Sequence, residues 1–303
     1  MRINQEAGSM NTVSIGNILE EHFGRNTAVS SCVPVAGGDI NRAYRLMLSN
    51  GISIFMKANI SENLPFFIAE SESLAAIAQT ESIGTPEVLG CGEDPKYGAF
   101  LLLEWCDGIQ GKTFFENFGH RLAAMHRANT SAFLANGRYG FCMDNYIGST
   151  PQINTPSSGW VSFFRNFRLL PQIRRAGRYF STSDHRDIDS LLNRLGSLLP
   201  EPDFPSLLHG DLWGGNYIAG NDGEVCLIDP ASYVGHFEAE LAMTELFGGF
   251  PFRFYAAYEE INPIPKEYHR RRDLYNLYHL LNHLNLFGEG YLNPVLRIIR
   301  RYS

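Results

Sequence analysis

The sequence has few cysteines, no excess of basic charge and no long apolar run, and each shortage excludes a class of protein. Its five cysteines are scattered and never form a CxxC pair, which argues against a disulfide framework or a zinc site and favours a reducing compartment. Lys and Arg number 25 against 32 Asp and Glu, so the formal net charge is -7. Because nucleic-acid binding needs clustered basic residues, we expect no nucleic-acid partner.

Apolar segments are too short to enter a membrane. No run approaches the ~18 residues of a transmembrane helix, and residues 1–17 contain no apolar stretch of signal-peptide length. Together with the scattered cysteines, this predicts a cytoplasmic protein with no membrane partner. The sequence leaves the oligomeric state open.

Strand and helix patterns divide the 303 residues into two parts. Strand-like runs, separated by turn signals such as Asn50-Gly51, occupy residues 31–35, 43–48, 52–58, 88–91 and 99–104. Helical periodicity is found at residues 13–24 and 65–79, and it dominates after residue 113, as in WVSFFRNFRLLPQIRRA at residues 160–176. This order predicts an α+β fold. We expect a flexible extension at residues 1–11, a small β-rich domain at residues 12–104 and a larger, mainly helical domain at residues 105–303.

The sharpest chemical signal is HGDLWGGN at residues 209–216, followed by the tripeptide IDP. Asp211 follows an apolar strand, Asn216 comes five residues later, and Asp229 ends a second short strand. Two carboxylates and an amide brought together by a hairpin suit Mg²⁺, which prefers oxygen ligands, and they also suit phosphoryl transfer. Each residue alone is more often a turn residue, but the combination at this spacing favours a catalytic site.

Several further segments give the chain a resemblance to a known family. HGDxxxxN with a later strand-borne Asp is similar to the catalytic and metal loops of the protein-kinase-like fold, in its aminoglycoside/choline kinase branch. AGGDINRAYRL, IFMKAN, YGFCMDNYIGSTPQ, EAELAMTELFGGFP and LYHLLNHLNLFGEGYL extend this to a close resemblance to the fructosamine kinase (ketosamine-3-kinase) family over about residues 12–295.

This resemblance implies a two-lobed fold that binds ATP and magnesium in the cleft between its lobes. It implies phosphorylation of the third-carbon hydroxyl of a ketosamine, a sugar joined to an amine, as a deglycation step. Asp211 would then orient and deprotonate the hydroxyl, and Asn216 and Asp229 would bind magnesium. Glu240 matches the acidic residue that braces the catalytic loop of related kinases.

Lys57 lies in an apolar strand and therefore needs either solvent or a carboxylate. On the following helix, Glu70 shares the face of Phe67 and Leu74, whereas Glu72 falls on nearly the opposite face. We expect Glu70 to pair with Lys57, and Lys57 to contact the ATP phosphates as kinases do.

Other candidate nucleotide contacts are backbone groups. Gly37 and Gly38, in the first hairpin, would let amide groups approach phosphate oxygens, although ordinary hairpins also use glycine. Glu104 and Cys106 occupy the expected junction of the two domains, where kinase-like folds bind adenine through the backbone.

On the acceptor side, Trp213 follows the presumed base by two residues. Its indole would stack on the sugar or, equally, brace the loop as a core residue. Asp144, Asn145 and Tyr146 would line the same site or only shape it.

Two clusters favour ordinary roles. His279 and His283 have zinc-ligand spacing but no accompanying third ligand, so interior or groove histidines are expected. The run with Arg174, Arg175 and Arg178 is interpreted as a solvated helix end or a contact for phosphate.

Two rival functions remain. One is a kinase of another small alcohol, such as an aminoglycoside, choline or a sugar. The other is a non-catalytic nucleotide-binding module, which the presence of base, lysine and metal ligands makes a poor fit.

Overall fold

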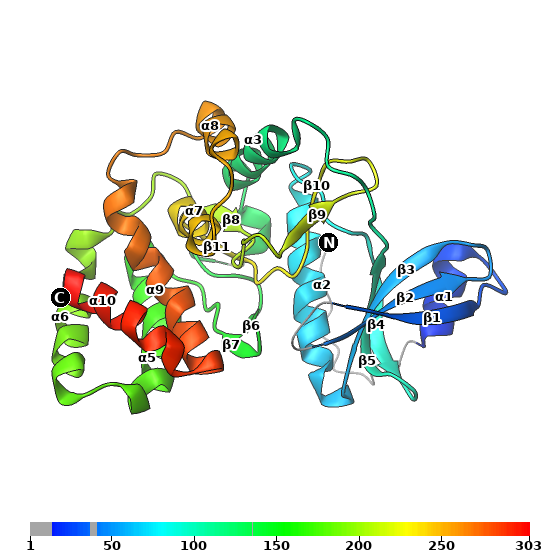
Figure 1. Ribbon diagram of the computed structural model, residues 1–303, viewed down its shortest axis with the longest axis horizontal. Coiled ribbons are helices and arrows are strands. Elements are labelled where there is room, and N and C mark those ends of the chain that lie inside the picture. The colour runs from blue at the N-terminus through cyan, green and yellow to red at the C-terminus, as the bar shows by residue number, and fades with distance from the viewer. Residues whose placement is uncertain (1–13, 37–40, 135) are drawn as a thin grey trace. The chain divides into compact units, whose positions relative to one another are not determined.

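The computed structural model describes residues 14–36, 41–134 and 136–303 (Figure 1). The chain divides into two compact units. The first comprises residues up to Ser71 together with Glu87–Trp105, and the second comprises Glu72–Pro86 together with Cys106–Ser303. The sequence predicts a single boundary after residue 104, whereas the larger unit also includes Glu72–Pro86. Ala76 and Ile77, in the second half of a helix, belong to the larger core.

The first unit contains a five-stranded antiparallel sheet in the order β1-β2-β3-β5-β4. Its elements are α1 (Ile15–Phe23), β1 (Val29–Val35), β2 (Arg42–Leu48), β3 (Ser53–Asn59), η1 (Ser61–Asn63), α2 (Leu64–Gln79, which continues into the second unit), β4 (Val88–Asp94) and β5 (Gly98–Glu104). Burial alternates along β3 as expected for a strand with one face on a core. Ile54 and Met56 on that face join a cluster with Ile18 and Leu19 of α1, which lies against the sheet (Figure 1).

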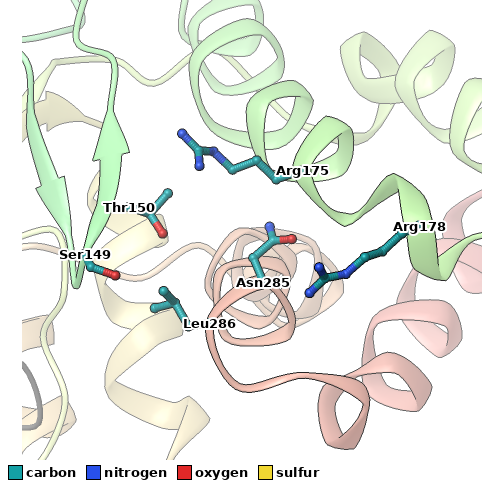
Figure 2. Close-up of a pocket in the computed structure, with 6 residues that line it drawn as sticks. All are labelled: Ser149, Thr150, Arg175, Arg178, Asn285 and Leu286. Carbon is teal, nitrogen blue, oxygen red and sulfur yellow. The ribbon is translucent and has the colours of Figure 1, made fainter.

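The second unit is mainly helical and contains three short two-stranded ribbons, β6-β7, β8-β11 and β9-β10, in its described residues. Its elements are α3 (Phe114–Arg127), η2 (Ser131–Phe133), β6 (Asn145–Ile147), β7 (Thr150–Gln152), α4 (Trp160–Phe163), η3 (Phe164–Leu169), α5 (Leu170–Arg175), η4 (Ala176–Tyr179), α6 (Thr182–Leu198), β8 (Ser206–Leu208), β9 (Tyr217–Ala219), β10 (Val225–Leu227), β11 (Tyr233–Gly235), α7 (Phe237–Leu246), α8 (Phe252–Ile261), α9 (Tyr268–Phe287), η5 (Glu289–Tyr291) and α10 (Leu292–Tyr302). The β6-β7 turn, η4 and the end of α9 border a polar pocket (Figure 2).

The helix expected over residues 160–176 is interrupted by the π-helical segment η3. Pro171 has no amide hydrogen, so the carbonyl of Phe167 loses the α-helical partner four residues on. Arg168 Nη1 donates to that carbonyl at 3.0 Å instead. The interruption therefore places the Arg168 side chain in the interior, where it is fully buried.

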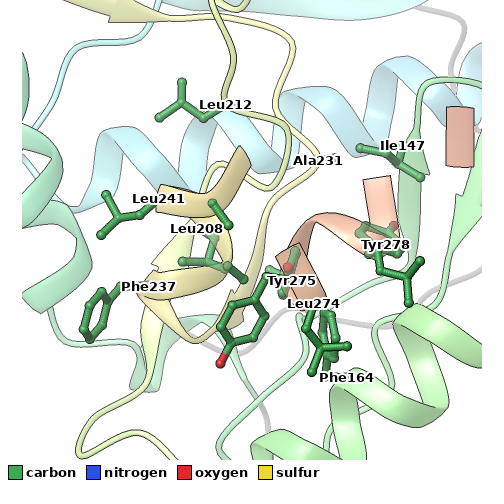
Figure 3. Packing of buried hydrophobic residues seen from close by; sticks show 14 of the residues in the cluster. Ile147, Phe164, Leu208, Leu212, Ala231, Phe237, Leu241, Leu274, Tyr275 and Tyr278 are labelled. Atoms are coloured by element: carbon green, nitrogen blue, oxygen red, sulfur yellow. The ribbon is translucent and has the colours of Figure 1, made fainter. Parts of the chain in front are cut away.

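The core of the second unit surrounds the HGD segment. Leu208 at the end of β8 and Leu212 just beyond it are fully buried, and they pack in one cluster with Leu241 of α7 and with Tyr275 and Tyr278 of α9 (Figure 3). Burial of leucines on both sides of Asp211 fixes the backbone that carries it. No helix in the described parts of the chain has the length and apolarity needed to span a membrane.

Candidate active site

Two loops of the second unit carry the three polar residues singled out from the sequence. β8 pairs with β11, so the residues after β8 run beside the residues before β11. The amide of Ala231 donates to the carbonyl of His209 at 2.9 Å. Gly210 has φ +85°, and a Cβ there would lie 2.1 Å from the carbonyl oxygen of Ala231. This close approach of the two loops requires glycine.

Glu240 of α7 anchors the first loop through its backbone amides. Its two carboxylate oxygens accept the amides of His209 and Gly210, each at 2.8 Å, and His126 Nε2 lies 3.2 Å from Oε2. Burial acts to raise the pKa of Glu240, but the hydrogen bond and charge of His126, together with His209 and the Gly210 amide, lower the pKa overall. Glu240 therefore acts as a buried anion that fixes the loop, as the brace expected from the sequence would.

His209 links the two loops through its ring. Its Nε2 donates to the carbonyl of Ile228 at 2.8 Å, and its Nδ1 accepts the amide of Asp211 at 3.3 Å. Burial lowers the pKa of His209, which agrees with a neutral ring that donates at one nitrogen and accepts at the other. The ring thereby orients the peptide group of Asp211.

Asp211 lies at the surface of this braced loop, with 23% of its side chain exposed. Asn216 Nδ2 donates to the Asp211 carbonyl at 2.8 Å and to Asp211 Oδ2 at 3.3 Å. Burial and, after it, the charge of Asp229 raise the pKa of Asp211 to about 7, although the bond from Asn216 acts in the opposite direction. Asp229 therefore lies close enough for its charge to act on Asp211.

Asp229 follows β10 in a left-handed backbone conformation, with φ 57°. Non-glycine residues rarely adopt this conformation, and such strain often occurs at functional sites. The preceding amide, of Ile228, donates to the carbonyl of Asn216 at 3.1 Å, so Asn216 and Asp229 are held at neighbouring points.

The donor set of this loop pair fits magnesium. Asn216 uses its Nδ2 toward Asp211, which turns Oδ1 away from that bond, and Asp229 contributes a carboxylate beside the charge of Asp211. A hard divalent cation that keeps several waters is satisfied by one amide oxygen and one carboxylate. Within the described residues there is no group of three or more His, Cys, Asp or Glu side chains that would hold a metal by themselves.

Trp213 is not a core residue. Its side chain is 39% exposed, whereas Trp160 is completely buried. The indole packs edge-on against Phe247 at 6.3 Å between ring centroids, and a Cβ on Gly215 would lie 2.4 Å from the indole ring. Of the two expectations for Trp213, the geometry favours a side chain available to a ligand.

In the first unit, Lys57 and Glu70 form the ion pair expected from the helix periodicity. Lys57 Nζ lies 2.6 Å from Glu70 Oε1, and the side chains are only 12% and 13% exposed. Glu72 is exposed to solvent. The helix face that carries Glu70 is therefore the one that meets the sheet.

The remaining expected nucleotide contacts are only partly described. Gly37 and Gly38 lie outside the described residues. Glu104 ends β5, and its amide donates to the carbonyl of Glu87 at 2.9 Å, so this amide is already used within the first unit. Cys106 begins the long second segment of the other unit, and its Sγ lies 3.9 Å from Sγ of Cys226.

Asn145 has a structural role beside the second of these loops. Its Nδ2 donates to the carbonyl of Ser232 at 2.7 Å, and its Oδ1 accepts from Gln152 and Asn154. Asp144 accepts the amide of Asn154 at 2.7 Å. These residues therefore shape the site, which was one of the two expectations for them.

Sequence reasoning missed three residues that support or approach the site. His126 contacts Glu240 from α3, and the buried Arg168 donates to Asn154 Oδ1 at 2.6 Å. His279 is an interior histidine as expected, but its Nδ1 lies 3.9 Å from Asp211 Oδ1, and burial lowers its pKa to about 3. A histidine on an apolar helix face was the available signal for His126 and His279, since a buried ring needs a partner.

The small β-rich unit, the larger helical unit and the braced HGDxxxxN loop define a protein-kinase-like fold. The chain is similar to the aminoglycoside phosphotransferase APH(4)-Ia, with a TM-score of 0.61, 18% identity and coverage of 94% of this chain and 97% of that one, which supports the fold alone. It is more similar to a candidate fructosamine-3-kinase of known structure from Haemophilus somnus, with a TM-score of 0.82, 28% identity and coverage of 95% and 96%.

The chain belongs to the fructosamine kinase family, whose family model matches residues 11–303. It is 39% identical over 293 residues to a probable ketoamine kinase from Synechocystis, covering 95% of each chain. It is 37% identical over 281 residues to the chloroplastic protein-ribulosamine 3-kinase of Arabidopsis thaliana, covering 92% of this chain and 84% of that one.

Proposed function

We propose that this protein is an ATP-dependent kinase that phosphorylates the third-carbon hydroxyl of a ketosamine. Membership of the fructosamine kinase family and 37% identity to a protein-ribulosamine 3-kinase support the reaction and the acceptor. The observation that carries the proposal is Asp211, a partly exposed carboxylate on a loop fixed by Glu240 and His209, beside Asn216 and Asp229. This is the arrangement that phosphoryl transfer to a hydroxyl needs.

Asp211 would position the acceptor hydroxyl and take its proton. The braced peptide and the bond from Asn216 limit the movement of its carboxylate, and fixed geometry is the main contribution that a protein makes to this reaction. The transferred phosphoryl group passes from ATP to the acceptor oxygen, and the hydroxyl proton passes to Asp211 Oδ.

Asn216 and Asp229 would hold magnesium. When bound, the ion supplies positive charge against the phosphates of ATP. The left-handed backbone at Asp229 and the hydrogen bond between Ile228 and Asn216 fix the two ligands before the ion arrives.

Lys57, held by Glu70, would contact the phosphates of ATP, and backbone groups at Gly37, Gly38, Glu104 and Cys106 would contact its phosphates and adenine. Trp213 would stack on the sugar of the acceptor, because its side chain is partly exposed and it follows Asp211 by two residues. These roles remain predictions.

A panel of acceptors tests the function. Phosphate transfer from ATP is measured with ribulosamines, fructosamines, an aminoglycoside, choline and free sugars. We expect turnover of ketosamines with kcat/KM at least tenfold above the other alcohols. Preferred use of an aminoglycoside, choline or a sugar would replace the proposed acceptor while leaving a kinase.

The variant Asp211→Asn tests the mechanism. The amide preserves the shape of the side chain but cannot accept the proton, so we expect kcat to fall by at least ~10²-fold, with ATP affinity close to that of the unmodified protein. Steady-state kinetics and calorimetric ATP titration measure the two effects. Normal turnover by this variant contradicts the role given to Asp211.

A further inference from the structure

A polar pocket in the second unit has no part in the proposed chemistry. It has a volume of about 320 Å³ and is lined by Ser149, Thr150, Arg175, Arg178, Asn285 and Leu286 (Figure 2). The lining comes from the β6-β7 turn, the end of α5 with η4, and the end of α9. We refer to it as the arginine pocket.

The arginine pocket is positively charged. Within the described residues, neither Arg175 nor Arg178 forms a salt bridge, and Arg178 Nη2 donates only to the hydroxyl of Tyr179, at 2.8 Å. In a chain with net charge -7, two arginines that line one pocket without a carboxylate leave an uncompensated site for an anion. A guanidinium group can donate two parallel hydrogen bonds to two oxygens of a carboxylate or a phosphate.

The walls of the pocket supply further donors and are fixed. Figure 2 shows the hydroxyl groups of Ser149 and Thr150 on the side of the pocket opposite Arg178. Asn285 Nδ2 donates to the carbonyl of Gln172 and to Gln172 Oε1, at 3.0 and 2.8 Å, which anchors the α9 wall to α5. The α9 wall of the pocket is therefore held in place relative to α5.

The β6-β7 ribbon and α9 border both the pocket and the loops around Asp211. In the β6-β7 ribbon, Gln152 Nε2 donates to the carbonyl of Ala231, two residues after Asp229. On α9, His279 lies 3.9 Å from Asp211, and Leu286, seven residues later, lies on the same face of the helix and lines the pocket. Seven residues correspond to about 10 Å along the helix axis.

We propose that the arginine pocket binds an anionic group, a carboxylate or a phosphate, of the acceptor whose hydroxyl reacts at Asp211. This rests on the proposed function and narrows its substrate class to anionic ketosamines. Two sources of the anion are compared: the carboxylate of a free amino acid whose side-chain amine carries the sugar, and the terminal phosphate of a phosphorylated sugar. The carboxylate lies many bonds from the third-carbon hydroxyl and so suits a site about 10 Å along α9, whereas the terminal phosphate lies only a few bonds from it and is the shorter-range alternative.

Paired acceptors test this proposal. The first pair is the ribulosamine formed on the side-chain amine of lysine and the same compound with its carboxylate converted to a carboxamide. The second pair is a ribulosamine of a neutral amine with and without a phosphate on the terminal carbon of the sugar. For each pair, the ratio of kcat/KM for the anionic to the neutral acceptor is measured in the unmodified protein, in Arg175→Gln/Arg178→Gln and in Arg174→Gln.

We expect one of the two ratios to exceed ten in the unmodified protein and to fall about tenfold in the double variant, mainly through KM. Such a loss corresponds to about 1.4 kcal/mol. Arg174 is exposed and does not line the pocket, so Arg174→Gln controls for the loss of one positive charge and should keep the ratio. Arg175→Lys with Arg178→Lys should restore part of it. The pair that responds identifies the source of the anion.

Ratios that are near one, or that stay unchanged in the double variant, overturn the proposal while leaving ketosamine kinase activity intact. An equal loss with the anionic and the neutral acceptor also overturns it, because a merely structural role would produce that result. Absence of turnover with all four ketosamines would instead contradict the proposed function, and the pocket proposal with it.

Discussion

Lys57 and Glu70 are almost completely withdrawn from solvent, so each charge depends on the other. Removing one partner of a buried ion pair is destabilising, because the second charge stays buried without that partner. We expect Lys57→Met to lower kcat/KM for ATP by ~10²-fold or more, and Glu70→Gln to lower it less, because Lys57 keeps its charge. Steady-state kinetics at varied ATP measures both effects.

Glu72 is the matched control for Glu70, since it lies two residues away and is exposed. Glu72→Gln should leave the kinetics within twofold of the unmodified protein. A large defect in Glu72→Gln with a small one in Glu70→Gln would contradict the role of the observed ion pair.

Glu240 satisfies two backbone amides and a histidine at once. In Glu240→Gln one oxygen becomes an amide group that faces a backbone donor, so at least one of these bonds is lost. We expect a loss of ~2–3 kcal/mol in the free energy of unfolding and a fall in kcat of about tenfold, because Asp211 loses its support. Glu245→Gln, on the same helix but 23% exposed, should lose less than ~1 kcal/mol. Urea denaturation and steady-state kinetics compare the two variants.

The residues of the HGDxxxxN loop could be recognised from the sequence because they lie close along the chain. Asp211, Asn216 and Asp229 need only one hairpin to meet. His279 could not be assigned to the site, because its proximity to Asp211 depends on the packing of α9 against α7 and β8, which no local pattern specifies.

Among the elements, the π-helical interruption η3 has the clearest energetic role. It places Arg168 between the rings of Tyr233 and Phe163, 3.9 and 4.6 Å from their centroids, and within hydrogen-bond distance of Asn154. No acidic side chain pairs with it among the described residues. The planar guanidinium is therefore held by stacking and by carbonyl acceptors.

Arg168→Lys keeps the charge but loses the planar group. We expect the free energy of unfolding to fall by ~2–4 kcal/mol, because the acceptors on Asn154 and on the backbone of Ile153 lose their donors. Arg165→Lys, in the same segment but only partly buried, should change stability by less than ~0.5 kcal/mol. Denaturation in urea measures both, and equal stabilities would contradict a structural role for the buried guanidinium.

The long strands of the first unit could be predicted because turn signals such as Asn50-Gly51 separate their apolar runs, and along β3 burial alternates with a period of two residues. The ribbon strands of the second unit are only three residues long, so the sequence predicts only the two apolar ones before Asp211 and Asp229, β8 and β10, and not the strands that pair with them. Pro171 indicates from the sequence that the helix is disturbed, because it lacks an amide hydrogen. It does not specify that the disturbance takes the form of a π-helical segment.

At the level of the whole molecule, buried histidines link stability to pH. Burial lowers the pKa of His236 and His279 to about 3 and also lowers the pKa of His209 and His283. Below about pH 6.5 the unfolded chain therefore binds protons that the folded chain does not, and stability falls as the pH decreases toward 3. Asp211, whose pKa is raised to about 7, opposes this between pH 7 and 4, but the histidines outnumber it.

We therefore expect the free energy of unfolding to decrease between pH 6.5 and 4.5, with each strongly shifted histidine contributing up to ~1.4 kcal/mol per pH unit. His236→Asn keeps a side chain that can accept the amide of Glu238 at the start of α7 and removes one titrating group. Its pH dependence should be shallower, as measured by denaturation at several pH values. An unchanged slope would exclude His236 as a contributor.

The α+β class and the family could be inferred from the sequence, since strand patterns precede helical ones and the catalytic motif is specific. The division of α2 between two units could not, because Ala76 and Ile77 continue the same amphipathic pattern as the residues before them. Which core a helix joins depends on residues distant in the chain.

The three tryptophans occupy three different environments, which has an optical consequence. Trp160 is sealed in the core, Trp105 lies beneath the guanidinium of Arg45 at 4.4 Å, and Trp213 stands in contact with water two residues from Asp211. Indole emission shifts with the polarity around the ring, so the red edge of the spectrum belongs to Trp213 and the blue edge to Trp160. The protein thus carries one fluorescent reporter two residues from Asp211 and a second, independent reporter of the folded core.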